Sequence, residues 1–124
     1  MDATVVATTP FAFYSGQIPE VEPGKLGFVE HTSAQTGATI STGWGVLRDI
    51  ETTPHTVWYD EVLALHATEG ALEIDFDGVS HPMKVGDFVW IRAGSTVVYR
   101  ATGGASTVFF AIVPADWAAR RPTP

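Results

Sequence analysis

The stretch Gly86-Asp87-Phe88-Val89-Trp90-Ile91-Arg92-Ala93-Gly94-Ser95 has the form of a turn that feeds a strand and ends in a second turn. Glycine closes a tight bend, and the carboxylate of the following aspartate can accept hydrogen bonds from the turn backbone. The four residues after the aspartate are β-forming and apolar. The stretch therefore predicts a buried strand over Asp87–Ile91.

Short β-type runs separated by Gly, Pro, Asp and Ser continue on both sides of this stretch, from residue 24 onward. Asp77-Gly78 signals a tight hairpin, and Thr102-Gly103-Gly104 signals another. A sustained helical period is absent, and only Ala115–Arg121 predicts a short helix. The other predicted strands are Lys25–Glu30, Thr39–Leu47, Thr56–Ala67, Ala71–Phe76, Thr96–Ala101 and Thr107–Val113. Many short strands without crossover helices predict an all-β sandwich or barrel.

The composition fits one folded domain and excludes several kinds of chemistry. With 124 residues, 45% of them hydrophobic, the chain has room for a single core. Seven scattered Lys and Arg against 14 Asp and Glu give a net charge of -7, which argues against a nucleic-acid partner. The absence of cysteine excludes disulfides, thiolate metal sites and thiol nucleophiles. No apolar run approaches the ~20 residues of a membrane span, and we expect a cytoplasmic protein.

Three segments carry a resemblance to the cupin superfamily. The Gly86–Ser95 stretch resembles the second cupin motif, in which G-D and four strand residues lead into P-x-G, and Tyr59–Val62 with Glu69–Leu72 resembles the first. The aromatic strand and P-A-x-W ending at Phe109–Trp117 are similar to those of EutQ-like proteins, which accompany ethanolamine utilisation. The resemblance covers about residues 40–117.

What the resemblance implies about the fold is a single small cupin β-barrel, or jelly roll. We expect residues 24–117 to form this barrel. The preceding residues 1–23, rich in Thr, Ala and Pro, are expected to be an N-terminal arm, and residues 118–124 a short flexible tail.

The chain departs from the EutQ-like pattern at two places. The pattern W-T-x-x-Y-D-E corresponds to His55–Glu61, so His55 replaces the usual aromatic residue. Between Glu61 and Gly70 the chain carries two additional residues, around Leu65–Ala67. These predict a bulge or a longer hairpin.

The resemblance also implies where a cupin metal would bind. Metal-binding cupins carry H-x-H-x3-E on the first motif and a third histidine on the second. These four positions correspond to His55, Val57, Glu61 and Val97. Because two of them are hydrophobic, we expect no metal cofactor; a divalent metal, if one is used, would be bound by His55 and Glu61 with a tyrosine or His66.

Four residues form the candidate catalytic set. The period-2 pattern puts residues 55, 57, 59 and 61 on one strand face, and in a cupin that face points into the barrel. His55, Tyr59 and Glu61 should therefore converge, and Tyr99, on the same face as Val97, joins them. An apolar pocket raises the pKa of Glu61, so that this carboxyl group can exchange protons near neutral pH, with His55 as partner and a tyrosine donating to a developing oxyanion.

Structural roles remain open for each member of this set. The alternative for Glu61 is a structural carboxylate tied to turn amides, to Arg92 or to Arg100, because buried carboxylates are rarely unpaired. His55 would then be a residue of the barrel rim, and the two tyrosines would be core aromatics with satisfied hydroxyls.

The remaining histidines and outward aromatics lead to separate expectations. His66 has the wrong strand parity for the site unless a bulge re-aims it, and His31 and His81 have the neighbours of surface residues. Trp58 and Val62 point outward by parity, and an outward aromatic patch favours a homodimer.

Three functions compete. The first is a small-molecule enzyme with isomerase or lyase chemistry, the second is a non-catalytic accessory protein that binds a small metabolite, and the third is a metal-dependent enzyme with a reduced ligand set. Kinase activity, which has been connected with EutQ-like proteins, has little support, because the phosphate-binding loop is missing and lysine occurs only at Lys25 and Lys84.

Overall fold

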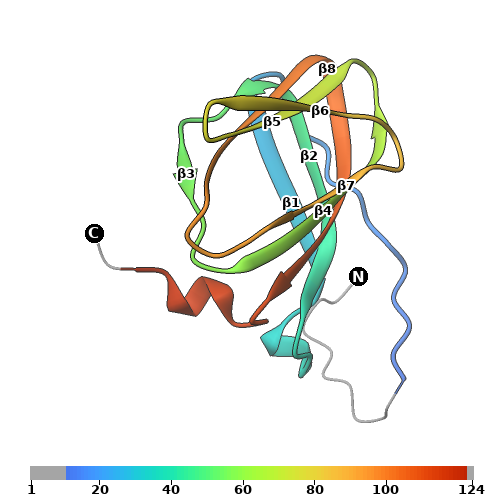
Figure 1. The fold of residues 1–124 in the computed structure, drawn as a ribbon. Helices are drawn as coiled ribbons and strands as arrows, with labels where there is room; N and C mark the ends of the chain where they lie inside the picture. Colours follow the sequence, from blue (N-terminus) through green and yellow to red (C-terminus); the bar gives the residue numbers. More distant parts are fainter. Residues whose placement is uncertain (1–10, 123–124) are drawn as a thin grey trace.

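The structure, a computed structural model, describes residues 11–122, and within them the chain is built almost entirely of antiparallel strands (Figure 1). A short 3-10 helix, η1 (Ala34–Thr36), follows the first strand, and a second, η2 (Trp117–Arg120), follows the last. Neither helix is long and apolar enough to cross a membrane. The strands are β1 (Lys25–Thr32), β2 (Ser41–Glu51), β3 (His55–Thr56), β4 (Asp60–Thr68), β5 (Ala71–Phe76), β6 (Val79–Met83), β7 (Phe88–Ile91) and β8 (Thr96–Val113).

The strands form the two walls of a barrel that share one long strand. The first wall has the order β1-β2-β8-β4-β7, and the second joins β3, β5 and β6 through β8. The first half of β8 pairs with β3 and β5, and its second half pairs with β2 and β4. The all-β prediction is confirmed, although the sheet does not close completely.

The prediction of a hairpin at Thr102-Gly103-Gly104 is wrong. β8 runs without reversal from Thr96 to Val113, and Gly103 and Gly104 take φ angles of 76° and 119°. They lie opposite a bulge in β2, where the Asp49 side chain accepts a 2.9 Å hydrogen bond from the Gly104 amide. The two glycines therefore bend one strand from the second wall into the first.

Other strand boundaries also differ from the predictions. The predicted strand Thr56–Ala67 is interrupted between β3 and β4, and β2 and β1 extend further than expected. β6 is not among the predicted strands; it pairs only with β5, and its Pro82 is compatible with this edge position. The predicted helix Ala115–Arg121 is reduced to the four-residue η2. The bulge expected from the additional residues is present, between Leu65 and Ala67.

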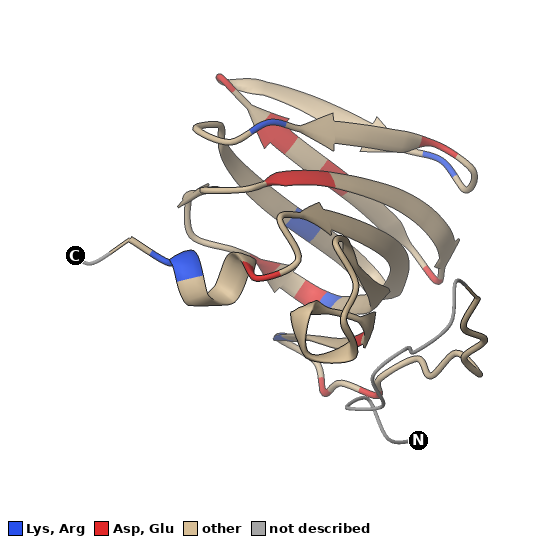
Figure 2. Ribbon diagram, turned by 90° about the horizontal axis from the view of Figure 1, so that it is seen from below, with Lys and Arg blue, Asp and Glu red and all other residues tan. Residues whose placement is uncertain are grey.

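The core lies between the two walls and follows the period-2 pattern of the strands. Leu65 in β4, Leu72 and Ile74 in β5, and Val97 in β8 are each 1–2% exposed. The Lys and Arg positions are scattered along the ribbon and lie among more numerous Asp and Glu positions (Figure 2).

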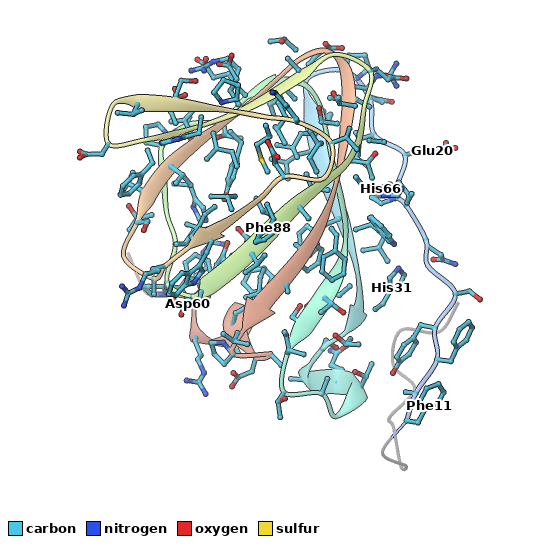
Figure 3. All side chains as sticks on the ribbon, turned by 45° about the vertical axis from the view of Figure 1, so that its right-hand side comes forward. Phe11, Glu20, His31, Asp60, His66 and Phe88 are labelled. Atoms are coloured by element: carbon cyan, nitrogen blue, oxygen red, sulfur yellow. The ribbon has the colours of Figure 1, made fainter. Side chains whose placement is uncertain are left out.

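The described part of the arm, residues 11–23, has no helix or strand and passes along the outside of the barrel (Figure 3). Its Gln17 amide donates a 2.9 Å hydrogen bond to Nε2 of His31 in β1. His31 is only 8% exposed, so the prediction that it lies on the surface is wrong. The expectations for residues 1–10 and 123–124 fall outside the described residues.

The hairpin predicted at Asp77-Gly78 is confirmed and provides a first test of the fold. Phe76 pairs with Val79, and Asp77 and Gly78 have φ angles of 52° and 77°. A Cβ atom at Gly78 would meet no other atom within 4 Å, so Gly78→Ala carries only a conformational cost. We expect a loss of about 1 kcal/mol in the free energy of unfolding, measured by urea denaturation. Asp77→Asn, which tolerates the same backbone conformation, is the control, and equal stability of Gly78→Ala and wild type would contradict this description of the turn.

Candidate functional site

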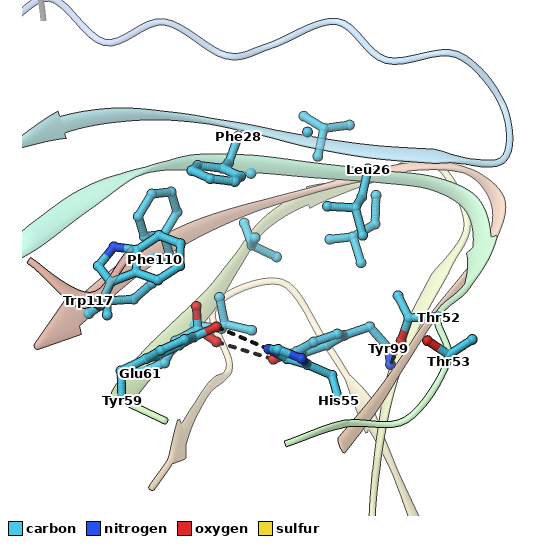
Figure 4. Close-up of a pocket in the computed structure, with 17 residues that line it drawn as sticks. Leu26, Phe28, Thr52, Thr53, His55, Tyr59, Glu61, Tyr99, Phe110 and Trp117 are labelled. Carbon is cyan, nitrogen blue, oxygen red and sulfur yellow. Dashed lines mark hydrogen bonds between the residues drawn. The ribbon is translucent and has the colours of Figure 1, made fainter. Parts of the chain in front are cut away.

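A cavity of about 370 Å³ lies inside the barrel, between β1 and β2 on one side and the segment leading into β3 on the other (Figure 4). Its walls are mostly aliphatic and aromatic, and they include Leu26 and Phe28, which are half-exposed. The four residues of the predicted set all line this cavity: His55, Tyr59, Glu61 and Tyr99. A largely apolar cavity with a few converging polar groups is the usual form of a small-molecule site.

Glu61 is the central polar group of the cavity. Its side chain projects inward from β4, the residue is 8% exposed, and its Oε1 accepts a 3.2 Å hydrogen bond from the Tyr99 hydroxyl. Burial raises the pKa of Glu61 to about 7, and the hydrogen bond from Tyr99 offsets part of this effect. The carboxyl group is therefore divided between its acidic and basic forms near neutral pH.

Neither arginine considered as a partner of Glu61 contacts it. Arg100 lies on the outer face and binds Glu51, Glu73 and Asp75 at 2.6–3.1 Å. Arg92 lies over the ring of Trp90, 5.2 Å from its centroid. The alternative of a structural ion pair for Glu61 is therefore wrong.

The two tyrosine hydroxyls stay protonated at neutral pH, and that of Tyr99 donates a hydrogen bond to Glu61. Burial and the nearby Glu61 raise the pKa of both Tyr59 and Tyr99 above the ordinary value of a phenol, so both hydroxyls stay protonated. The Tyr59 hydroxyl and Nε2 of His55 share a hydrogen bond of 3.4 Å. Two pairs, Tyr99–Glu61 and Tyr59–His55, therefore lie side by side in the cavity (Figure 4).

The side chains of residues 57, 59 and 61 all point into the barrel, although the strand is interrupted between β3 and β4. Val57 is held in strand-like contact, because its amide donates to Ser95 O at 3.0 Å and its carbonyl accepts from the Gly94 amide at 2.8 Å. Asp60 accepts a 2.8 Å hydrogen bond from the Ala93 amide and fixes the same turn. These hydrogen bonds join the segment before Glu61 directly to the turn at residues 93–95, and they hold Glu61 in position.

The positions where the resemblance places metal ligands do not fit a divalent ion. Val57 and Val97 are 1% and 2% exposed and offer only hydrocarbon. Within residues 11–122, His, Asp and Glu nowhere gather in a group of three that could hold a metal. The oxygen and nitrogen donors in the cavity are His55, Glu61 and two protonated phenols, and protonated phenols are poor metal ligands.

The sequence predicts a pocket walled by aromatic residues, but it does not identify Trp117, Phe28 and Phe110 among them. Trp117, seen in the sequence only as part of the P-A-x-W ending, covers one side of the cavity, next to Phe28 and Phe110. It is held there because the Trp58 indole donates a 2.7 Å hydrogen bond to its carbonyl. Trp58 is consequently half-buried, and the outward patch expected with Val62 is not exposed.

The remaining histidines lie outside the cavity. His66 is the exposed residue of the β4 bulge and packs against Trp44, with ring centroids 4.7 Å apart. His81 is exposed on β6, as expected. It lines a second hollow of about 670 Å³ between β6 and β7, together with the exposed Phe88 and Trp90. That hollow contains no buried carboxyl group comparable to Glu61.

Comparisons with known proteins agree with this architecture. The family model of the ethanolamine utilisation protein EutQ matches residues 17–119. No curated protein sequence matches the chain.

Solved structures show the same fold at low sequence identity. Ethanolamine utilization protein Q of Salmonella typhimurium LT2 is 24% identical, with a TM-score of 0.63 over 73% of this chain and 70% of that one. The EutQ protein of Clostridium difficile is 20% identical, with a TM-score of 0.66 over 77% and 67%. A cupin 2 conserved barrel domain protein of Salinispora arenicola CNS-205 is 17% identical, with a TM-score of 0.61 over 86% and 96%.

Proposed function

The chain belongs to the EutQ family and has the cupin barrel, and from this premise we propose that it is a small-molecule enzyme in which Glu61 transfers protons. The reaction is an isomerisation or a lyase-type elimination of a small metabolite, without a metal-dependent step. Glu61 is the base and the acid, Tyr59 and Tyr99 donate hydrogen bonds, and His55 positions Tyr59.

The observation that carries this proposal is the position of the Glu61 carboxyl group, which lies inside an apolar cavity with a neutral hydrogen-bond donor, Tyr99, as its partner. An acid–base catalyst works best when its pKa lies near the operating pH, and burial raises the pKa of Glu61 to about 7. Structural carboxylates elsewhere in this chain have partners, as Glu51, Glu73 and Asp75 do with Arg100. Glu61 lacks such a cationic partner among the described residues, which favours a functional role.

The geometry supports a simple division of labour. Tyr99 holds Oε1 of Glu61 and leaves Oε2 to remove a proton from a carbon atom of the substrate. The electron pair left on that carbon is delocalised onto a neighbouring oxygen, where the Tyr59 hydroxyl donates a hydrogen bond. The protonated Glu61 then returns its proton to another carbon, which isomerises the substrate, or to a leaving group, which completes a lyase reaction.

The experiment that tests this proposal does not require a known substrate. The protein is incubated with a mixture of small metabolites in D2O, and each compound is examined by mass spectrometry for enzyme-dependent uptake of deuterium. We expect at least one compound to be labelled, equally well with EDTA and with added divalent ions. Labelling that appears only with a metal would instead favour the metal-dependent alternative, and binding of a metabolite without labelling would favour the accessory protein.

A further inference from the structure

We propose that the ligand of this cavity is a small organic cation, of the class in which a positively charged nitrogen carries methyl groups. The inference rests on the proposed function, because it names the substrate class of the same site. Its support comes from the rings that surround Glu61 and from the charges that are present and absent.

Aromatic rings form a connected wall around the cavity. Tyr59 and Trp117 have ring centroids 5.0 Å apart, Trp117 and Phe28 are 6.1 Å apart, and Phe28 and Phe110 are 5.8 Å apart. Figure 4 shows Phe28 above this space and Phe110 and Trp117 at its left, while Tyr59, Glu61, His55 and Tyr99 border it from below. An aromatic enclosure of this kind is the usual receptor for methylated ammonium groups, because each ring attracts a cation through its quadrupole.

The charge inside the cavity has one sign. Glu61 is its carboxylate, and no lysine or arginine is among the residues that line it. An anionic ligand such as a phosphate ester would meet this carboxylate and no compensating cation. The net charge of -7 on the chain attracts cations to the surface in general.

The sparse polar groups also argue against a ligand with many hydroxyl groups. Outside Glu61, the hydrogen-bonding side chains of the cavity are Thr52, Thr53, His55, Tyr59, Tyr99 and Trp117. Thr52 already accepts a hydrogen bond from the Tyr99 amide, and His55, Tyr59 and Tyr99 pair as described above. The Trp117 indole donates to Glu30. A methylated cation needs no hydrogen-bond donor, and its methyl groups match the apolar wall.

Binding of such a cation would also set the protonation state of the base. A positive charge beside Glu61 lowers the pKa of its carboxyl group, so that binding near pH 7 releases about half a proton per site. The ligand therefore converts Glu61 into the carboxylate that the proposed reaction requires.

The test compares choline with its neutral isostere 3,3-dimethylbutan-1-ol, which has the same shape but no charge. Binding of each to the full chain is measured by calorimetry at pH 7 in two buffers of different ionisation enthalpy. We expect choline to bind at least about tenfold more tightly, with release of protons. Equal affinity for the two compounds would overturn the inference, and so would failure of choline to bind at tens of millimolar.

Three variants test whether choline binds against the aromatic wall of the cavity. Trp117→Leu is expected to weaken choline binding about tenfold or more and to leave the neutral isostere unchanged. Phe28→Leu, at a half-exposed position, is expected to act in the same direction and keeps the test valid if Trp117→Leu does not fold. Trp90→Leu, which removes an exposed tryptophan outside the cavity, is the matched control and should bind choline as wild type does. Unchanged choline binding in both cavity variants would overturn the inference.

The two proposals fail in different ways. If Glu61 titrates near pH 7 and deuterium labelling is found, but choline has no advantage over its isostere, only the cation inference is wrong. If Glu61 titrates at the ordinary value of a glutamate, the proposed function is wrong whatever the cavity binds.

Discussion

Replacing Glu61 with Gln is expected to slow the uptake of deuterium into the labelled metabolite at least about 100-fold, because the amide cannot take up the transferred proton. The variant keeps the shape of the side chain and an oxygen that can accept the hydrogen bond from the Tyr99 hydroxyl, so the cavity should stay intact. The rate of labelling is measured by mass spectrometry with saturating metabolite.

Glu20→Gln is the matched control, because it makes the same chemical change at an exposed position in the arm. It should label the metabolite at the rate of wild type. If Glu61→Gln kept the wild-type rate while Glu20→Gln did too, another group would have to carry the proton, and the assignment of Glu61 would be wrong.

Glu61→Gln is also expected to stabilise the folded protein at pH 8, by about 2–3 kcal/mol. Burial raises the pKa of Glu61 from its ordinary value of 4.5 to about 7, so the folded state binds the proton more tightly than the unfolded state. The contribution of Glu61 to the free energy of unfolding is therefore fully present below pH 4.5 and is lost as the pH rises to about 7. Glutamine never ionises and does not pay this penalty.

Urea denaturation at pH 4 and pH 8 measures the effect. The difference in free energy of unfolding between Glu61→Gln and wild type should be near zero at pH 4 and at its largest at pH 8. Glu20→Gln should follow wild type at both values. A variant that is less stable than wild type at pH 8 would indicate that the Glu61 carboxylate makes a favourable structural interaction, contrary to the site described above.

The sequence was sufficient to predict the candidate site because its members share one local pattern. His55, Tyr59 and Glu61 alternate within seven residues, and Tyr99 follows Val97 with the same alternation. Their inward orientation required only strand parity, which the hydrogen bonds of Val57 preserve across the gap between β3 and β4.

The features that could not be predicted depend on contacts between distant segments. Trp117 covers the cavity because Trp58, 59 residues earlier in the chain, binds its carbonyl. The glycine pair at 103–104 bends β8 because Asp49 accepts a hydrogen bond from it, although the same local sequence is typical of a hairpin. His31 is buried because the arm passes beside it. None of these contacts has a local signature.

The most direct test of the central claim is the titration of Glu61 itself. Protein labelled with ¹³C at the glutamate carboxyl groups is followed by NMR from pH 3 to pH 9, and the Glu61 resonance is identified by its absence from Glu61→Gln. We predict a midpoint near pH 7 for this resonance, well above the values of the exposed glutamates. A midpoint near 4.5 would contradict the account, because Glu61 would then be permanently ionised at neutral pH and unsuited to return a proton.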